Sequence, residues 1–384
     1  MGALIGRAVP PITLGRFARG RKILASSATP ISAVDWHGAD RAVRIWLLLV
    51  AALVLCMVVV GGATRLTDSG LSITEWQPIL GAIPPLSEAD WLSAFEKYKT
   101  IPEYAIVNSG MSLSQFKFIY WWEWTHRFLG RFIGFAFAVP LVGFWLARML
   151  RPGFALKLLG VLALGGLQGA IGWYMVMSGL VDRVDVSQYR LALHLLTAFG
   201  ILALLVWLAL DVGPPPDRMR TPTLPRSALF GARLLFVLVL LQAGLGALVA
   251  GLKAGLTYNT WPLMDGRFVP DGLGILSPWY VNVFENITAV QFDHRMVAYA
   301  VAAVALWQVV SLARAGTDEC TDERAVGSAG LLAAAVLAQI ALGIWTLVHG
   351  VPLALGLAHQ AGAAIVVATA TLNLHVVTRA AARA

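Results

Sequence analysis

Long apolar segments dominate the chain, and most polar residues lie in the stretches between them. Eight segments reach the roughly 20 residues that a helix needs to cross a hydrocarbon core about 30 Å thick. They lack the alternation of apolar and polar residues that strands of an outer-membrane barrel require. The pattern predicts transmembrane α-helices at Val43–Gly62, Phe118–Ala147, Ala155–Ser178, Arg190–Val212, Leu229–Gly251, Ile287–Ala313, Gly327–His349 and Val351–Val377.

Composition and charge agree with this pattern. Of the 384 residues, 58% are hydrophobic and 13% are charged, and the mean hydropathy of +0.72 excludes an ordinary water-soluble globule. If the N-terminus lies inside, 18 of the 29 Lys and Arg residues fall on the inner side, so the positive-inside rule predicts that both termini are inside. The net charge of +8 is therefore interpreted as membrane orientation, and no nucleic-acid partner is expected.

The N-terminal residues leave the type of membrane open. Residues 1–34 contain no Asp or Glu but several Arg, Lys, Ser and Thr, which is typical of a basic cytoplasmic tail and also of a mitochondrial transit peptide. The bacterial inner membrane is the first interpretation, and the mitochondrial inner membrane is the alternative. The two cysteines, Cys56 and Cys320, lie too far apart in this topology to form a disulfide.

The two halves of the chain show an internal duplication. Gly70 with Trp76 aligns on Gly255 with Trp261, and Gln168 with Gly172 aligns on Gln339 with Gly343. Each half begins inside and has an even number of helices, so the repeats run parallel. The predicted fold is all-α, with eight transmembrane helices in two parallel-repeat four-helix bundles. Its parts are a basic tail (1–42), an N-terminal half (43–212), a linker (213–228), a C-terminal half (229–377) and a short tail (378–384).

Four histidines occupy matched positions in these halves, roughly 6–12 Å below the outer surface at the rise of an α-helix. A lone histidine in a helix is usually a packed residue, but two matched pairs at one depth indicate ligands. Imidazoles on facing helices suit haem iron, and structural zinc is less favoured because no Cys or acidic ligands lie nearby. The four are His126, His194, His294 and His359, whereas His37, His349 and His375 are interpreted as structural or interfacial.

The halves differ at a carboxylate. Glu123 precedes His126 by three residues on the same helical face, and the aligned residue in the second half is Gln291. An ionisable residue inside a membrane is a functional candidate, and the matched amide cannot take or give a proton, so Glu123 is predicted to be a functional residue. The alternative is a residue near the helix start that stabilises the helix dipole.

Three arginines and a long loop surround the predicted sites. Arg127, Arg131 and Arg295 either pair with haem propionates or extend towards lipid headgroups. The loop Leu66–Lys117 is expected to cover the first-half site as an amphipathic cap.

Three motifs accompany the histidine pairs: Gly61-Gly-Ala-Thr-Arg-Leu-Thr67, Ser69-Gly-Leu-Ser-Ile-Thr-Glu-Trp76 and Glu123-Trp-Thr-His-Arg127. On these motifs and the histidine pairs, the chain resembles the haem A synthase family from Val43 to Val377. The resemblance implies oxidation of the C8 methyl group of haem O to a formyl group by successive hydroxylation, giving haem A for cytochrome oxidase. It implies a haem B cofactor at His294 and His359 and the haem O substrate at His126 and His194. If the arginines pair with propionates, Arg295 is expected at the cofactor and Arg127 and Arg131 at the substrate. It also implies a catalytic role for Glu123. The chain resembles the subgroup without a cysteine pair in an outer loop.

The resemblance also implies contacts with the haem O synthase, which is a farnesyltransferase, and with an electron donor in the lipid membrane. It leaves open whether the chain forms homo-oligomers.

Two other classes of protein use similar features. A bis-histidine cytochrome b that only transfers electrons would need the four histidines but neither Glu123 nor unequal halves. A repeat-built transporter would bind its substrate near the midplane, away from these residues.

Overall fold

The computed structural model describes residues 36–181, 183–213, 224, 226–315 and 322–382. Several expectations concern residues outside these ranges. They are the basic tail up to residue 35 with its transit-peptide alternative, most of the linker (214–223 and 225), the segment that contains Cys320, and the last two residues. Contacts group Trp36–Ala384 into one unit, and every helix below belongs to it.

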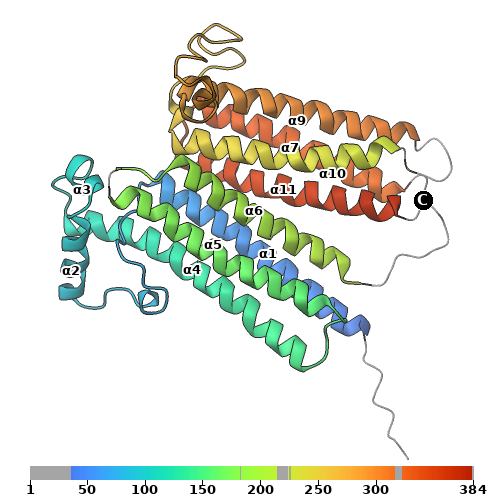
Figure 1. Cartoon of the computed structure of the whole chain (residues 1–384), viewed down its shortest axis with the longest axis horizontal. Helices are drawn as coiled ribbons and strands as arrows, with labels where there is room; N and C mark the ends of the chain where they lie inside the picture. Colours follow the sequence, from blue (N-terminus) through green and yellow to red (C-terminus); the bar gives the residue numbers. More distant parts are fainter. Residues whose placement is uncertain (1–35, 182, 214–223, 225, 316–321, 383–384) are drawn as a thin grey trace, which may run out of the picture. The chain divides into compact units, whose positions relative to one another are not determined.

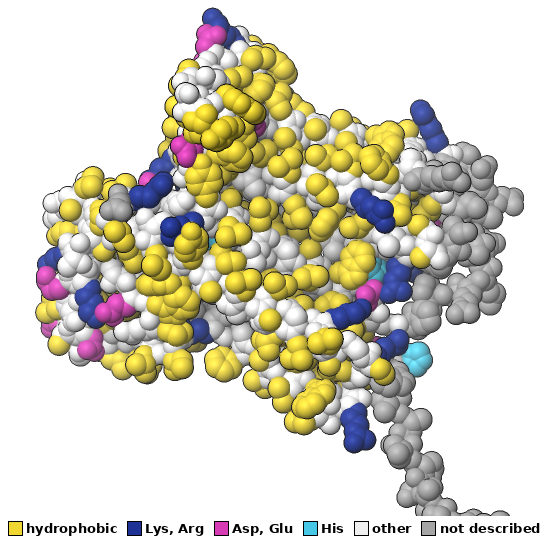
Figure 2. Space-filling model, in the orientation of Figure 1, with side chains coloured by type: hydrophobic (Ala, Val, Ile, Leu, Met, Phe, Trp, Pro, Cys, Tyr) yellow, Lys and Arg dark blue, Asp and Glu magenta, His cyan; other side chains and the backbone are white. Residues whose placement is uncertain are grey.

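Within the described ranges the chain is helical, apart from turns and an isolated bridge between Met264 and Arg267. Eight of the described helices are long and apolar enough to cross a membrane, which confirms the predicted all-α membrane fold. Hydrophobic side chains cover much of the helical surface, as lipid contact requires (Figure 2). The eight are α1 (Trp36–Leu66), α4 (Leu113–Leu146), α5 (Phe154–Leu180), α6 (Gln188–Asp211), α7 (Arg226–Gly251), α9 (Ile287–Ala315), α10 (Glu323–Val348) and α11 (Leu353–Ala381) (Figure 1).

Short helices interrupt the two long loops between these spans. η1 (Leu80–Ala82), α2 (Glu88–Tyr98) and α3 (Pro102–Ile106) lie between α1 and α4. η2 (Ala254–Leu256), η3 (Trp279–Val281) and α8 (Asn282–Glu285) lie between α7 and α9.

Helix α4 begins at Leu113, five residues before the predicted start at Phe118. The reason is a capping box. The Ser112 hydroxyl accepts a hydrogen bond from the Gln115 amide N–H, and the Gln115 side chain accepts one from the Ser112 N–H. These two bonds satisfy groups that the first turn would otherwise leave unpaired, so the helix extends beyond its apolar run.

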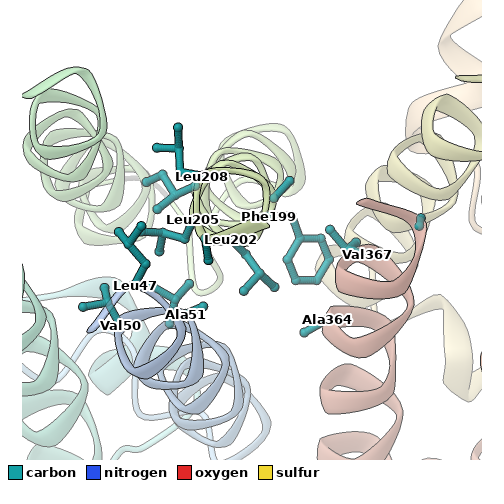
Figure 3. Close-up of a cluster of buried hydrophobic side chains, with 14 of the residues drawn as sticks. Leu47, Val50, Ala51, Phe199, Leu202, Leu205, Leu208, Ala364 and Val367 are labelled. Carbon is teal, nitrogen blue, oxygen red and sulfur yellow. The ribbon is translucent and has the colours of Figure 1, made fainter. Parts of the chain in front are cut away.

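The hydrophobic core lies where helices of the two halves meet. α1 and α6 from the N-terminal half contact α11, and α6 and α11 both contact α7 from the C-terminal half. Figure 3 shows Phe199 and Leu202 of α6 between Leu47 of α1 and Val367 of α11, and all four are almost completely buried. Close van der Waals packing of the large apolar side chains at this junction holds the two sets of helices together.

The segment between α1 and α4, residues 67–112, packs on the end of α4 and is called the α1–α4 cap below. Its contact is aromatic. The ring of Phe95 stacks on Phe116 with centroids 4.9 Å apart, and Trp91 lies edge-on to Tyr120 at 5.0 Å. Such pairs combine a large buried area with preferred ring geometries. The cap is thereby fixed over the end of α4 nearest to Glu123 and His126.

A buried carboxyl lies inside this cap. Glu103 is 4% exposed, and its Oε2 accepts a hydrogen bond of 3.0 Å from the hydroxyl of Tyr98, which itself accepts one from Asn108. Burial raises the pKa of Glu103 to about 7; the Tyr98 bond opposes this increase and nearby carboxylates add to it. Protonation of Glu103 therefore favours the folded cap.

We expect the cap to become less stable as the pH rises from about 5 to about 8. The pKa of folded Glu103 lies above its unfolded value, so its contribution is complete below the unfolded pKa and is lost as the pH passes about 7. The loss is on the order of 3 kcal/mol. Limited proteolysis of the cap at both pH values measures it.

Two variants serve as references in this measurement. Glu103→Gln should resist proteolysis equally at both pH values, because it cannot ionise. Glu96→Gln changes an exposed residue of α2 that pairs with Lys99 and should behave like the wild type. A wild-type cap that shows the same pH response as Glu103→Gln would contradict the prediction.

Candidate functional site

The four predicted histidines form two pairs in the structure. His126 on α4 lies within electrostatic reach of His194 on α6, and His294 on α9 lies within electrostatic reach of His359 on α11. Each of the four residues is half-buried and lies inside a membrane-spanning helix. This donor set fits a haem, whose iron takes two axial nitrogen ligands.

A glycine on a neighbouring helix touches each of the four rings. A Cβ placed on Gly61, Gly172 or Gly343 would lie closer to a ring atom than real Cβ contacts do, and one on Gly246 would be unusually tight, so a larger residue would shift the imidazole. The distances from such a Cβ are 2.9 Å to His126 Nε2 from Gly61 of α1, 2.9 Å to His194 Cε1 from Gly172 of α5, 3.1 Å to His294 Cε1 from Gly246 of α7 and 2.8 Å to His359 Cε1 from Gly343 of α10.

These contacts recur at the offsets found in the sequence. Gly61 and Gly246 are 185 residues apart, like Gly70 and Gly255, and Gly172 and Gly343 have the predicted offset of 171. The matching contacts are compatible with an internal duplication. Gly172 and Gly343 were matched when the two halves of the sequence were compared, but Gly61 and Gly246 were not predicted to meet histidine rings. A glycine in an apolar helix gives no sign of which side chain it meets.

Glu123 lies one turn before His126 in a dense network of hydrogen bonds. It is 2% exposed, and its Oε2 accepts bonds of 2.8 Å from both the Ser72 hydroxyl and the Ile73 amide N–H. Its Oε1 accepts two bonds from Arg127, at 3.0 Å from Nε and 2.6 Å from Nη2. Four hydrogen bonds to one carboxyl compensate it for the loss of water.

Arg127 also ties the α1–α4 cap to α4. Its Nη2 donates to the carbonyl of Ile73 at 2.7 Å, and its Nη1 donates to the carbonyl of Glu75 at 2.9 Å. Every guanidinium nitrogen of Arg127 therefore has a protein acceptor. The sequence motif Ser-Ile-Thr-Glu contains Ile73 and Glu75, but the pattern alone did not show that their backbone groups meet Arg127 and Glu123.

The matched place in the second half has the arginine without the carboxylate. Arg295 Nη2 donates to the carbonyl of Tyr258 at 2.8 Å, and Tyr258 is 185 residues after Ile73. Gln291 replaces Glu123 and donates to the same carbonyl at 3.2 Å. Arg295 is 8% exposed, and its Nε and Nη1 have no hydrogen-bond partner among the described residues.

Unpaired donors on a buried guanidinium are costly and fit an anionic ligand group. Arg131 has a similar spare donor: its Nε and Nη2 bind the carbonyls of Pro78 and Gln77, and its buried Nη1 has no partner in the described part of the chain. Haem carries two propionates, so Arg295 and Arg131 have the chemistry to bind one.

The protein partners of His375 and His349 lie close to these residues in the structure. His375 Nε2 contacts Asp211 Oδ1 at 3.0 Å, and its ring lies edge-on to Trp207. His349 Nδ1 contacts the carbonyl of Trp345 at 2.9 Å. Their contacts agree with the structural interpretation of these residues.

Comparison with known proteins gives one family match and many similar chains. The model of a family described as cytochrome oxidase assembly protein matches residues 44–371. A protein named Heme A synthase from Azorhizobium caulinodans is 51% identical over 352 residues, which cover 91% of this chain and 97% of the relative. Proteins of the same name from Parvibaculum lavamentivorans and Beijerinckia indica are 49% and 52% identical, and the matches cover 90% and 87% of this chain and 97% and 92% of those relatives.

Proposed function

The chain belongs to the haem A synthase family, and from this membership we propose that it converts haem O into haem A within the membrane. The reaction oxidises the C8 methyl group of haem O to a formyl group. The observation that carries the proposal is the inequality of two otherwise matched sites. Both have a histidine pair, ring-contacting glycines and an arginine bound to the preceding loop, but only the first has a buried carboxylate.

The N-terminal site is proposed to bind the substrate, between His126 and His194. The C-terminal site is proposed to hold a haem B cofactor between His294 and His359, with Arg295 at a propionate. When bound, haem B would supply electron transfer to or from the substrate site. The pairing of half-buried histidines in each half and the spare donors of Arg295 and Arg131 support these assignments.

Glu123 is proposed to act on the substrate as a fixed negative charge one turn from His126. Arg127 and the Ile73 N–H orient the carboxylate, and the Ser72 hydroxyl is the one donor of the four that can also pass a proton through its oxygen. The carboxylate can stabilise positive charge that develops near the oxidised carbon or exchange a proton with it. Arg127 remains a predicted substrate contact, with its observed bonds directed at Glu123 and the cap.

We also propose that the protein lies in the bacterial cytoplasmic membrane with both termini inside. An even number of spans puts both ends on one side, and the distribution of basic residues favours the inner one. The haem O synthase, an electron donor and a second copy of the chain remain predicted partners.

Acid–acetone extraction of the purified protein, followed by mass spectrometry of the released tetrapyrroles, tests the proposed function. We expect haem B together with haem O, its hydroxylated form or haem A. Haem B alone, from a host that makes haem O, would instead support a cytochrome b that only transfers electrons.

A further inference from the structure

Three of the four histidines are held by a glutamine as well as by a glycine. The side-chain amides of Gln168, Gln242 and Gln339 donate to the backbone carbonyls of His194, His294 and His359 at 2.9, 3.0 and 2.8 Å. Each glutamine precedes the glycine that touches the same ring by four residues, so both lie on one helical face. The spacing Gln-x-x-x-Gly therefore defines a holder for one histidine.

In the C-terminal half the holders also reach the rings. The Gln242 amide nitrogen lies 3.1 Å from Nδ1 and 3.3 Å from Nε2 of His294, and the Gln339 amide nitrogen lies 3.1 Å from Nδ1 of His359. When Nε2 of a neutral imidazole binds iron, Nδ1 carries the proton and needs an acceptor, which fixes the ring and tunes the ligand. The side-chain oxygens of Gln242 and Gln339 have no partner among the described residues, so each amide would offer this acceptor after turning towards the ring. Both ligands of the C-terminal site are thus restrained at backbone and ring.

Neither ligand of the N-terminal site has this ring contact. Gln168 binds only the backbone carbonyl of His194, whose Nδ1 is buried and has no partner among the described residues. For His126 the residue four before Gly61 is Met57, which corresponds to Gln242 at the offset of 185.

Met57 lies where the missing glutamine would be. Its Cε would be 3.2 Å from a Cβ on Gly130, one turn after His126, so it faces the same stretch of α4 that Gln242 reaches on α9. A thioether cannot donate a hydrogen bond to the His126 carbonyl or to its ring. The ring of His126 is also turned differently, with Nε2 rather than Cε1 against its glycine.

We propose that the glutamine holders are positioning residues that decide how long each site keeps its haem, and that Met57 makes the N-terminal site an exchange site. The inference rests on the proposed function. A cofactor site should retain its haem, and the two ring contacts of the C-terminal half restrain both ligands there. A substrate site must accept haem O and release haem A, and its ligands lack these restraints.

A reciprocal exchange of Met57 and Gln242 tests this proposal in the full-length protein. The readout is the rate at which each haem passes from the purified protein to an excess of apomyoglobin, with the haems identified by mass spectrometry. Gln242→Met should release haem B about 10-fold faster or more, the usual effect of losing a ligand's hydrogen-bond partner. Met57→Gln should slow release from the N-terminal site by a similar factor, and Met57→Leu should leave it unchanged.

The midpoint potential of haem B separates positioning from general stability. Gln242→Met and Gln339→Met remove an Nδ1 contact and should shift this potential, whereas Gln168→Met removes only a backbone contact and should not. Unchanged release rates in both exchange variants, or the same potential in all three glutamine variants, would overturn the proposal. Failure of the proposed function looks different, because the wild-type extract would then contain haem B alone.

Discussion

Replacing Glu123 with glutamine should reduce haem A formation by at least about 100-fold, the lower range for loss of a general acid or base. Glutamine has nearly the same shape and can still accept a bond from Ser72 or Ile73, so the cap contact is largely retained. What it lacks is the negative charge and the capacity to exchange a proton beside His126. Extraction and mass spectrometry should therefore show normal haem B and bound haem O with almost no haem A.

The second half shows that an amide is compatible with this place in the fold. Gln291 occupies the matched position, and Arg295 beside it still binds the loop carbonyl of Tyr258. Glu96→Gln, which makes the same change at an exposed carboxylate of α2 paired with Lys99, is the matched control and should leave haem A output unchanged. Normal haem A output from Glu123→Gln would remove Glu123 from the mechanism and leave it a structural ion-pair residue.

The sequence was sufficient to predict the membrane fold because each span repeats one physical requirement, a run of apolar residues long enough for the hydrocarbon core. Errors occurred at helix starts, where local hydrogen bonds rather than hydropathy decide. The capping box of Ser112 and Gln115 extends α4 beyond its predicted start at Phe118. That signal was present in the sequence as Ser-x-x-Gln before an apolar residue.

The site was only partly predictable, because its decisive contacts join residues far apart in sequence. The histidines could be found from their matched depth. The partners of Glu123 in the cap could not, since Ser72 and Ile73 lie about 50 residues before it and donate through a hydroxyl and a backbone N–H.

The sequence showed the position of Arg127 correctly but did not reveal all the groups that it binds. Its position four residues after Glu123 was visible in the sequence and is the spacing of a common helical ion pair. The sequence interpretation assigned it to a haem propionate or to the headgroups, whereas in the structure its guanidinium binds Glu123 and the cap. Glutamine holders were missed for a similar reason, because Gln242 looks like an isolated polar residue in an apolar helix.

The second large effect is expected from Arg127→Met, which should destabilise the protein by about 3–5 kcal/mol, the cost of leaving one partner of a buried ion pair alone. Glu123 would keep its two bonds from the cap but lose the cation that neutralises it, and its side chain is only 3% exposed. The change also removes the bonds to the carbonyls of Ile73 and Glu75. Thermal unfolding in detergent measures the loss.

A double-mutant cycle separates the charge from the cap contacts. Adding Glu123→Gln to Arg127→Met removes the unpaired charge, so the double variant should recover much of the lost stability while remaining inactive. Arg295→Met is the matched control, because its guanidinium binds the Tyr258 carbonyl and forms no ion pair with a carboxylate in the described ranges. Arg295→Met should destabilise the protein less than Arg127→Met does. The haem content of both variants is measured at the same time.

Equal losses from Arg127→Met and Arg295→Met, without recovery in the double variant, would show that the loop carbonyls rather than the ion pair carry the stability. Recovery of stability in the double variant would instead show that the first half contains a destabilising buried charge. The second half avoids this charge because Gln291 occupies the matched position. A protein gains no stability from such a charge when an amide can occupy the same place. The presence of Glu123 in one half would then have its explanation in the proposed reaction, for which Glu123 is proposed to supply a fixed negative charge.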